Sequence, residues 1–379
     1  MTKRIAVFTS IRSEYGILTP ILREINRASD FKLELIVAGA HLSKLHGYTI
    51  SHIINDGFSI YKKINFLKYE NGRINLQKSL AKLTQDIGRY FELEKPNLLI
   101  VMGDRFELMP VVTMALLYNI PIAHLSGGDI TLGSIDNQIR NAITKISNIH
   151  YVTNDIAMRN LLKMNEERWR IFNVGEPCLD IIDNLITIDK AQLYKEYSLL
   201  LSKKLIIATF HPETIDNQIT AELISNLFQE IIKNDEFQIL VTSSNFDKDG
   251  DEINECLHNL SKSFNNIKFT YNLGQIKYYS FLKHCDLVIG NSSSGIIEVQ
   301  SFNKPVVNIG KRQEGRLCNA NVYNVKPIVI DILKAINYVM KDDFKKKYLY
   351  KKNKYGDGNT AHQIINSLKK LNWEKLLVK

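Results

Sequence analysis

The stretch LLIVMGDRFELMP, residues 98–110, decides the fold class. Five apolar residues lead into Gly103, and Asp104, Arg105 and Glu107 follow directly. A continuous apolar run of this kind is typical of a strand that is buried on both faces of a parallel sheet. Ligands bind at the carboxyl ends of such strands, because the loops there do not have to pack in the core. We therefore expect these three polar residues at a ligand-binding edge.

Similar runs recur along the chain and alternate with segments of helical period. The first series of predicted strands covers residues 4–10, 33–40, 98–103, 120–126, 149–153 and 169–175. The second series covers residues 204–211, 237–244, 267–272, 286–293 and 305–310. Two such series predict an α/β protein with two doubly wound Rossmann-like domains that face a cleft, over residues 1–178 and 179–355. Residues 356–379 predict a C-terminal helix, with Thr360 as a candidate N-cap, that can cross back to the first domain.

Composition excludes several classes of protein. The 379 residues are 45% hydrophobic, which is enough for two cores. We find neither an export signal nor an apolar run of about 18 residues, so we expect a cytoplasmic protein without a membrane partner. The cysteines are far apart and predict reduced thiols, with no metal site; they are Cys178, Cys256, Cys285 and Cys318. The net charge of +9 fits nucleic acid or an anionic small ligand. Because no nucleic-acid-binding motif accompanies the charge, we expect the small ligand.

Polar residues follow the first two predicted strands. Arg12 and Ser13 fall in a turn into a helix, where backbone N–H groups and a guanidinium can grip a phosphate. An ordinary turn with a surface arginine explains them equally well. His41 follows the second strand, and a structural histidine is the alternative to a substrate-binding one.

Acidic residues gather after the next two strands. The segment HLSGGDITLGSIDNQIRNAITK, residues 124–145, contains Asp129, Asp136 and Arg140. A surface ion pair between Asp136 and Arg140, four residues apart on one helix, is the simple explanation for that pair. It does not explain why Asp104, Glu107 and Asp129 share one strand-end rim. Like charges there push at least one carboxylate toward its protonated form, which suits acid–base catalysis.

The second half supplies groups for an anion. His211 follows a strand, and Ser292, Ser293, Ser294 and Gly295 precede an apolar helical stretch whose first N–H groups can bind phosphate. Glu298, one turn later, can accept hydrogen bonds from ribose hydroxyls. Arg312 and Arg316 add charge for a diphosphate. A serine-rich N-cap with no ligand is the alternative for the serines alone.

These residues give the chain a family resemblance. It resembles the hydrolysing UDP-N-acetylglucosamine 2-epimerases of sialic acid biosynthesis, which have the two-domain GT-B architecture. The resemblance covers essentially the whole chain. It rests on six motifs in order: SIRSEYG, GDRFE, GGD followed by IDNQIRNAITK, FHPET, GNSSSGIIEV and GKRQEGR.

The resemblance implies a reaction and roles. UDP is eliminated from a UDP-sugar to leave a 2-acetamidoglucal, and water then adds with inversion at C2, so that UDP and N-acetylmannosamine are released. No cofactor and no metal take part, and relatives are dimers or tetramers. The implied catalytic residues are Asp104, Asp129 and Asp136, with Glu107 and His211 as further candidates. The implied substrate-binding residues are Arg12, Ser13, His41, Arg105, Arg140, Ser292, Ser293, Ser294, Gly295, Glu298, Arg312 and Arg316.

Two departures from the family pattern concern the sugar. Ser126 stands where some members have an acid, and Asp129 stands where some have glutamate. Either UDP-N-acetylglucosamine or a UDP-2,4-diacetamido-2,4,6-trideoxy-glucose of the legionaminic acid pathway is therefore a candidate substrate. Two other functions stay open, a GT-B glycosyltransferase and a catalytically inactive nucleotide-sugar sensor.

Overall fold

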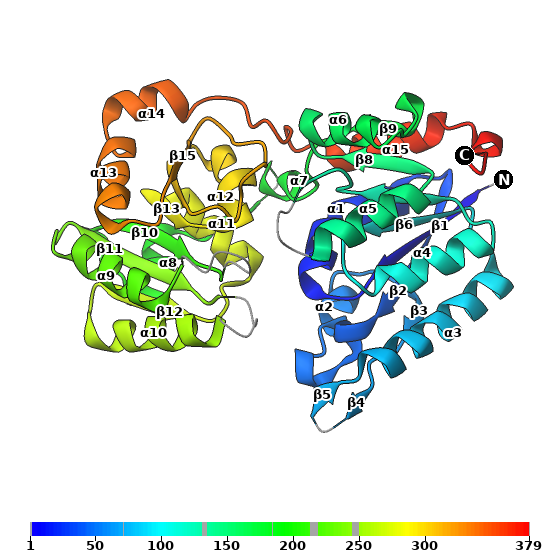
Figure 1. Ribbon diagram of the computed structural model, residues 1–379, viewed down its shortest axis with the longest axis horizontal. Coiled ribbons are helices and arrows are strands. Elements are labelled where there is room, and N and C mark those ends of the chain that lie inside the picture. Colours follow the sequence, from blue (N-terminus) through cyan, green and yellow to red (C-terminus); the bar gives the residue numbers. More distant parts are fainter. Residues whose placement is uncertain are drawn as a thin grey trace. The chain divides into compact units, whose positions relative to one another are not determined.

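The computed structural model describes residues 2–70, 72–130, 135–183, 185–212, 219–244 and 250–378. The chain forms two compact units, each built on its own parallel sheet (Figure 1). The first unit comprises Met1–Ile130, Ser134–Ile181 and Gly356–Lys379, and the second comprises Ile182–Tyr355. The prediction of two doubly wound α/β sheets is confirmed.

The sheet of the first unit has the order β3-β2-β1-β6-β7-β8-β9, and all its strand pairs are parallel. Its strands are β1 (Lys3–Thr9), β2 (Phe31–Ala38), β3 (Ile60–Ile64), β6 (Leu98–Met102), β7 (Ile122–Leu125), β8 (Ile149–Val152) and β9 (Ile171–Asn173). The order runs outward from β1 on one side and outward from β6 on the other. The winding direction therefore reverses between β1 and β6, and this is where open parallel sheets bind ligands.

Helices cover both faces of this sheet. One face packs against α1 (Arg12–Arg27), α2 (Ile50–Asn55) and α15 (Thr360–Lys370). The other packs against α3 (Leu76–Glu94), α4 (Leu108–Leu117) and α5 (Ile135–Ile146). The alternation of β1 explains the two cores, because Ile5 and Val7 lie in one core while Ala6 and Phe8 lie in the other. The smaller elements are 3-10 turns at Gly39–Leu42, Lys44–His46, Arg168–Arg170 and Trp373–Lys375, an antiparallel pair of β4 (Tyr69–Glu70) and β5 (Arg73–Ile74), and helices α6 (Asp155–Lys163) and α7 (Leu179–Asp183).

The second unit repeats the plan with the order β12-β11-β10-β13-β14-β15, again all parallel. Its strands are β10 (Lys204–Thr209), β11 (Phe237–Thr242), β12 (Ile267–Thr270), β13 (Leu287–Gly290), β14 (Val306–Ile309) and β15 (Val322–Val325). Its helices are α8 (Lys190–Glu196), α9 (Ala221–Ile232), α10 (Gly250–Ser263), α11 (Gly274–His284), α12 (Ser293–Ile297), α13 (Val329–Val339) and α14 (Asp342–Tyr348), with a 3-10 turn at Val299–Phe302. The larger core lies between the sheet and α9, α10 and α13. The winding reverses between β10 and β13.

The end of the chain belongs to the first unit (Figure 1). Helix α15 buries Ala361, Ile364 and Leu368 in the core that it shares with α1. The N-cap expected from Thr360 is wrong, because the N-cap residue is Asn359 and its side chain makes no cap bond. The carboxylate of Asp180 caps the helix instead, accepting from the backbone N–H groups of Thr360 at 2.8 Å and of Ala361 at 2.6 Å.

We predict that Asp180→Ala loosens the C-terminal helix. Loss of an N-cap acceptor costs about 1–2 kcal/mol of stability, and here the lost bonds also tie α15 to the first unit. Limited proteolysis should then release a C-terminal fragment that the unaltered protein retains. The matched control is Asp189→Ala, which removes a cap that lies within α8 itself, on Ala191 and Gln192. Equal C-terminal protease resistance in Asp180→Ala and the unaltered protein would contradict this account.

Candidate active site

In the first unit, polar side chains join the loops that follow β1 and β6. The Ser10 hydroxyl donates to Glu107 Oε1 at 2.9 Å, and Arg105 Nε donates to the same oxygen at 2.6 Å. Glu107 is buried, whereas Arg105 keeps about a third of its side chain exposed. The predicted strand-end cluster thus contains a partly buried ion pair at the point where the winding reverses.

The acids after β6 and β7 meet through Arg140 of α5. Its guanidinium is buried and forms an ion pair with the Asp104 carboxylate. It also donates to the backbone oxygen of Asp129 at 2.7 Å. The Asp129 carboxylate accepts from Asn154 Nδ2 at 3.3 Å. The structure therefore brings Asp104, Asp129 and Arg140 together, and Asp136 lies one turn before Arg140 on the same helix.

A carboxyl group that the sequence analysis did not single out lies near Glu107 and Arg105. Glu14 of α1 is only 4% exposed, and its Oε2 accepts from the Ser10 N–H at 2.9 Å and from the Thr9 hydroxyl at 3.1 Å. Burial raises the pKa of Glu14 from an ordinary 4.5 to about 7. Glu14 lies within the motif SIRSEYG, so its position was visible, but its burial was not.

Two histidines of this unit are buried and neutral. His41 bonds Thr49 through Nδ1 at 2.8 Å and Thr9 through Nε2 at 3.2 Å, and burial lowers its pKa to about 4. His124 bonds the Gly103 carbonyl oxygen through Nε2 at 2.8 Å, and burial lowers its pKa to about 3. These rings hold the strand ends in place. Arg12 and Ser13, by contrast, are exposed at the start of α1. Substrate contact by His41, Arg12 and Ser13 stays a prediction.

In the second unit, Asn291 organises the strand ends. Its side chain accepts from the backbone N–H of His211 and donates to the backbone oxygen of the same residue, both at 2.8 Å. Its own backbone oxygen accepts from Arg312 at 3.0 Å and from Gln313 at 2.9 Å. Burial, together with the Arg312 charge, lowers the pKa of His211 to about 4. The loops after β10, β13 and β14 are therefore fixed to one residue, which the sequence analysis did not single out.

The predicted serine segment starts α12, and two tyrosines of α11 contact it. The Ser292 hydroxyl accepts from the backbone N–H of Ser294 at 3.4 Å. Tyr278 bonds the Ser294 hydroxyl at 2.8 Å, and Tyr279 donates to Glu298 Oε1 at 2.8 Å. The Ser294 hydroxyl donates to the other Glu298 oxygen. The predicted groups are thus brought together, and Glu298 is bound by protein donors that sequence reasoning had missed. Gly295 is buried within the helix. Arg316 is half-buried and lies in the same loop as Arg312, after β14.

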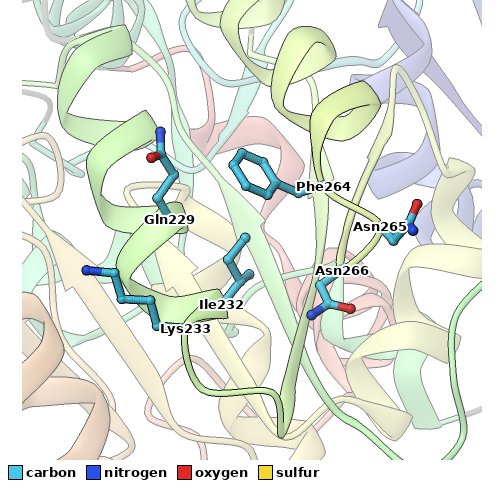
Figure 2. A pocket seen from close by; sticks show the side chains of 6 residues that line it. All are labelled: Gln229, Ile232, Lys233, Phe264, Asn265 and Asn266. Carbon is cyan, nitrogen blue, oxygen red and sulfur yellow. The ribbon is translucent and has the colours of Figure 1, made fainter.

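A hollow of about 420 Å³ lies elsewhere in the second unit (Figure 2). Its lining residues are Gln229, Ile232, Lys233, Phe264, Asn265 and Asn266. They flank the amino ends of β11 and β12, so the hollow lies at the edge of the sheet away from His211 and Asn291. Its lining offers amides and one lysine but no carboxylate, and it does not suit acid–base chemistry.

Metal and membrane features were sought in the part of the chain that the structure describes. There, no group of three or more His, Cys, Asp or Glu side chains is placed to hold a metal ion. No described helix combines the length and apolar character needed to cross a bilayer.

Comparison with known proteins decides the family. The sequence profile described as UDP-N-acetylglucosamine 2-epimerase matches residues 23–369. The chain belongs to this family. The predictions of the family and of an enzyme of the UDP-sugar 2-epimerase type are confirmed.

Individual members of the epimerase family match over nearly their full length. A Campylobacter jejuni protein named GDP/UDP-N,N'-diacetylbacillosamine 2-epimerase (hydrolyzing) is 36% identical over 382 residues, which cover 100% of this chain and 99% of that protein. A Legionella pneumophila protein named UDP-N,N'-diacetylbacillosamine 2-epimerase (hydrolyzing) is 31% identical, with 97% and 96% covered. The crystal structure of the UDP-GlcNAc 2-epimerase from Neisseria meningitidis bound to UDP-GlcNAc superposes with a TM-score of 0.82 at 17% identity, with 98% and 100% covered. The fold is therefore the GT-B-like fold of these enzymes.

We predict that Gly290→Ala disrupts the second unit. Gly290 has φ +128°, and a Cβ there would lie 1.9 Å from the Thr209 backbone oxygen, so neighbouring strands would have to separate. The expected loss of stability is at least about 3 kcal/mol, measured by denaturant unfolding. Gly103→Ala is the matched control, because Gly103 also follows a buried strand with φ +79° but has open space at its Cβ. Its cost should be about 1–2 kcal/mol, from backbone strain alone. Equal losses in the two variants would show that the clash does not matter.

Proposed function

We propose that this protein is a hydrolysing UDP-sugar 2-epimerase. In this reaction a carboxylate acts as the base and removes the C2 proton of the sugar. The bond between C1 and the UDP oxygen then breaks, and an unsaturated sugar forms. Water then adds its hydroxyl to C1 while a proton reaches C2 from the opposite face. UDP and the free 2-epimer are released. The observation that carries this proposal is the cluster of Asp104 and Asp129, which follow the neighbouring strands β6 and β7, around Arg140 of α5, in a chain of this family.

The two units have different tasks in this proposal. The first unit supplies acid and base from Asp104, Asp129 and Asp136, with Glu107 as a further carboxylate, because proton transfer at C2 and at the departing oxygen needs positioned carboxyl groups. The second unit binds UDP through Arg312, Arg316 and the start of α12, where charge and backbone N–H groups suit a diphosphate. His211 is neutral, so in this scheme it acts as a hydrogen-bonding partner of the substrate or as a proton carrier.

For the sugar we propose a UDP-2,4-diacetamido-2,4,6-trideoxyhexose. The relatives from Campylobacter jejuni and Legionella pneumophila that are named for diacetylbacillosamine support it, at 36% and 31% identity over nearly the whole chain. UDP-N-acetylglucosamine is the second candidate. It is supported by a Neisseria meningitidis protein named UDP-N-acetylglucosamine 2-epimerase, which is 28% identical over 338 residues.

The test is incubation of the pure protein in deuterated water with each UDP-sugar separately, followed by NMR. Release of UDP and a 2-deuterated 2-epimer is the expected result, faster with the diacetamido sugar than with UDP-N-acetylglucosamine. Transfer of the sugar only after an acceptor is added would instead show a glycosyltransferase. Tight binding with unchanged substrate would show a sensor. A higher kcat/KM for UDP-N-acetylglucosamine would reverse the substrate assignment and leave the reaction intact.

We predict that Asp104→Asn and Asp136→Asn each lower kcat by at least about a hundredfold, because each removes a carboxyl group that exchanges protons with the sugar. UDP affinity, measured by calorimetry, should change little. The control is Asp86→Asn on α3, where the aspartate forms a surface ion pair with Lys82. A normal turnover in either site variant would remove that residue from the catalytic set.

A further inference from the structure

Two buried glutamates of the first unit form a pair that neither the sequence motifs nor the family comparison assigns. Glu14 is 4% exposed and Glu107 is 2% exposed. Ser10 connects them, since its N–H donates to Glu14 Oε2 and its hydroxyl donates to Glu107 Oε1, each at 2.9 Å. The second oxygen of each carboxyl group is also buried, and neither finds a hydrogen-bond partner among the described residues.

The charges around this pair do not balance two carboxylates. The charged groups that act on Glu14 are Glu107 and Arg105, both from the loop before α4. His41, in the turn after β2, is connected to Glu14 through the Thr9 hydroxyl, which bonds both side chains. The His41 ring is neutral, because burial lowers its pKa and the nearby His52 of α2 lowers this pKa further. Arg105 is thus a single cation facing two acids in a site of low polarity, and one carboxyl group must be protonated.

The partners of the two carboxyl groups place that proton on Glu14, which accepts from a hydroxyl and an amide, whereas Glu107 binds a guanidinium. The Thr9 hydroxyl and the Ser10 N–H both donate to Glu14 Oε2, so this oxygen is already an acceptor twice. The proton therefore resides on Oε1, the buried oxygen without a partner. Glu107 instead accepts from Arg105 Nε at 2.6 Å, and the guanidinium charge makes this a charge-assisted bond. The raised pKa of Glu14, about 7, agrees with this assignment.

Arg105 is the group through which this pair can affect a ligand. Its Nε is committed to Glu107, while its terminal nitrogens bind no acceptor in the described part of the chain. About a third of its side chain is exposed. We propose that the pair of Glu14 and Glu107 holds a single proton, on Glu14, and thereby keeps Arg105 in the position from which it binds the anionic substrate. Glu14 is then a positioning residue, and this role rests on the proposed function of the site.

A pH profile tests the proposal. When Glu14 ionises, a second negative charge draws Arg105 toward the pair, so substrate binding weakens and KM rises. We expect kcat/KM of the unaltered protein to fall roughly tenfold between pH 6 and pH 9 through the loss of one charge-assisted contact, mainly in KM. In Glu14→Gln, which cannot ionise, the ratio of kcat/KM at pH 6 to that at pH 9 should approach one. Glu34→Gln is the matched control. This buried glutamate of β2 is bound by Arg4 and Tyr90, and its variant should keep the ratio of the unaltered protein. An unchanged ratio in Glu14→Gln would overturn the proposal.

A second measurement does not depend on activity. In protein labelled with ¹³C at glutamate carboxyl groups, one signal should titrate near pH 7 and vanish in Glu14→Gln. In Glu107→Gln the same signal should titrate at lower pH, because the neighbouring negative charge is gone. Titration of Glu14 below pH 5 in the unaltered protein would overturn the placement of the proton even if the enzyme epimerises UDP-sugars. A titration near pH 7 in a protein without epimerase activity would instead refute the proposed function and leave the pair standing.

Discussion

The reversal of winding within each sheet is the constraint on which the site depends. Helical crossovers leave β1 and β6 in opposite directions, and likewise β10 and β13, and in open parallel sheets ligands bind at the carboxyl ends of such strands. Each unit then fixes the two exposed loops to each other with polar bonds. In the first unit Ser10 bonds Glu107, and in the second Asn291 bonds both backbone groups of His211. Groups that are far apart in the chain thus become fixed neighbours, and only fixed neighbours can divide acid, base and anion-binding roles among themselves.

Burial decided which parts of the fold could be predicted. The eleven predicted strands are all present, because a strand covered on both faces leaves a continuous apolar run in the sequence. The strands that were not predicted, β3 and β15 among them, lie at sheet edges or in the small β4-β5 pair. In β3, Tyr61, Lys62 and Lys63 are exposed in succession, so no apolar run marks it. The cap of α15 was missed for a related reason, since its acceptor, Asp180, is supplied by a distant part of the chain.

The site could be located from the sequence, but its bonding could not. The motifs correctly placed polar residues after strands, and Arg140 near Asp136 suggested an ion pair within α5. The structure shows the Asp104 carboxylate as a further partner of Arg140, and this partner depends on which strands lie side by side. The sequence analysis did not single out Glu14 and Asn291. Their roles depend on burial and on the number of hydrogen bonds they make, and a sequence motif shows neither.

The electrostatics of the two units follow one rule. Burial lowers the pKa values of His41, His124 and His211 to between about 3 and 4, so these imidazoles are uncharged at neutral pH. Positive charge at the strand ends therefore comes from arginines, which stay charged at every pH at which a protein works. In the proposed function, an anionic ligand therefore meets a constant positive field, and the carboxyl groups exchange protons. Glu14, whose pKa is about 7, is the carboxyl group among these residues that can change its charge near neutral pH. In the proposed role, this change of charge alters the position of the Arg105 side chain.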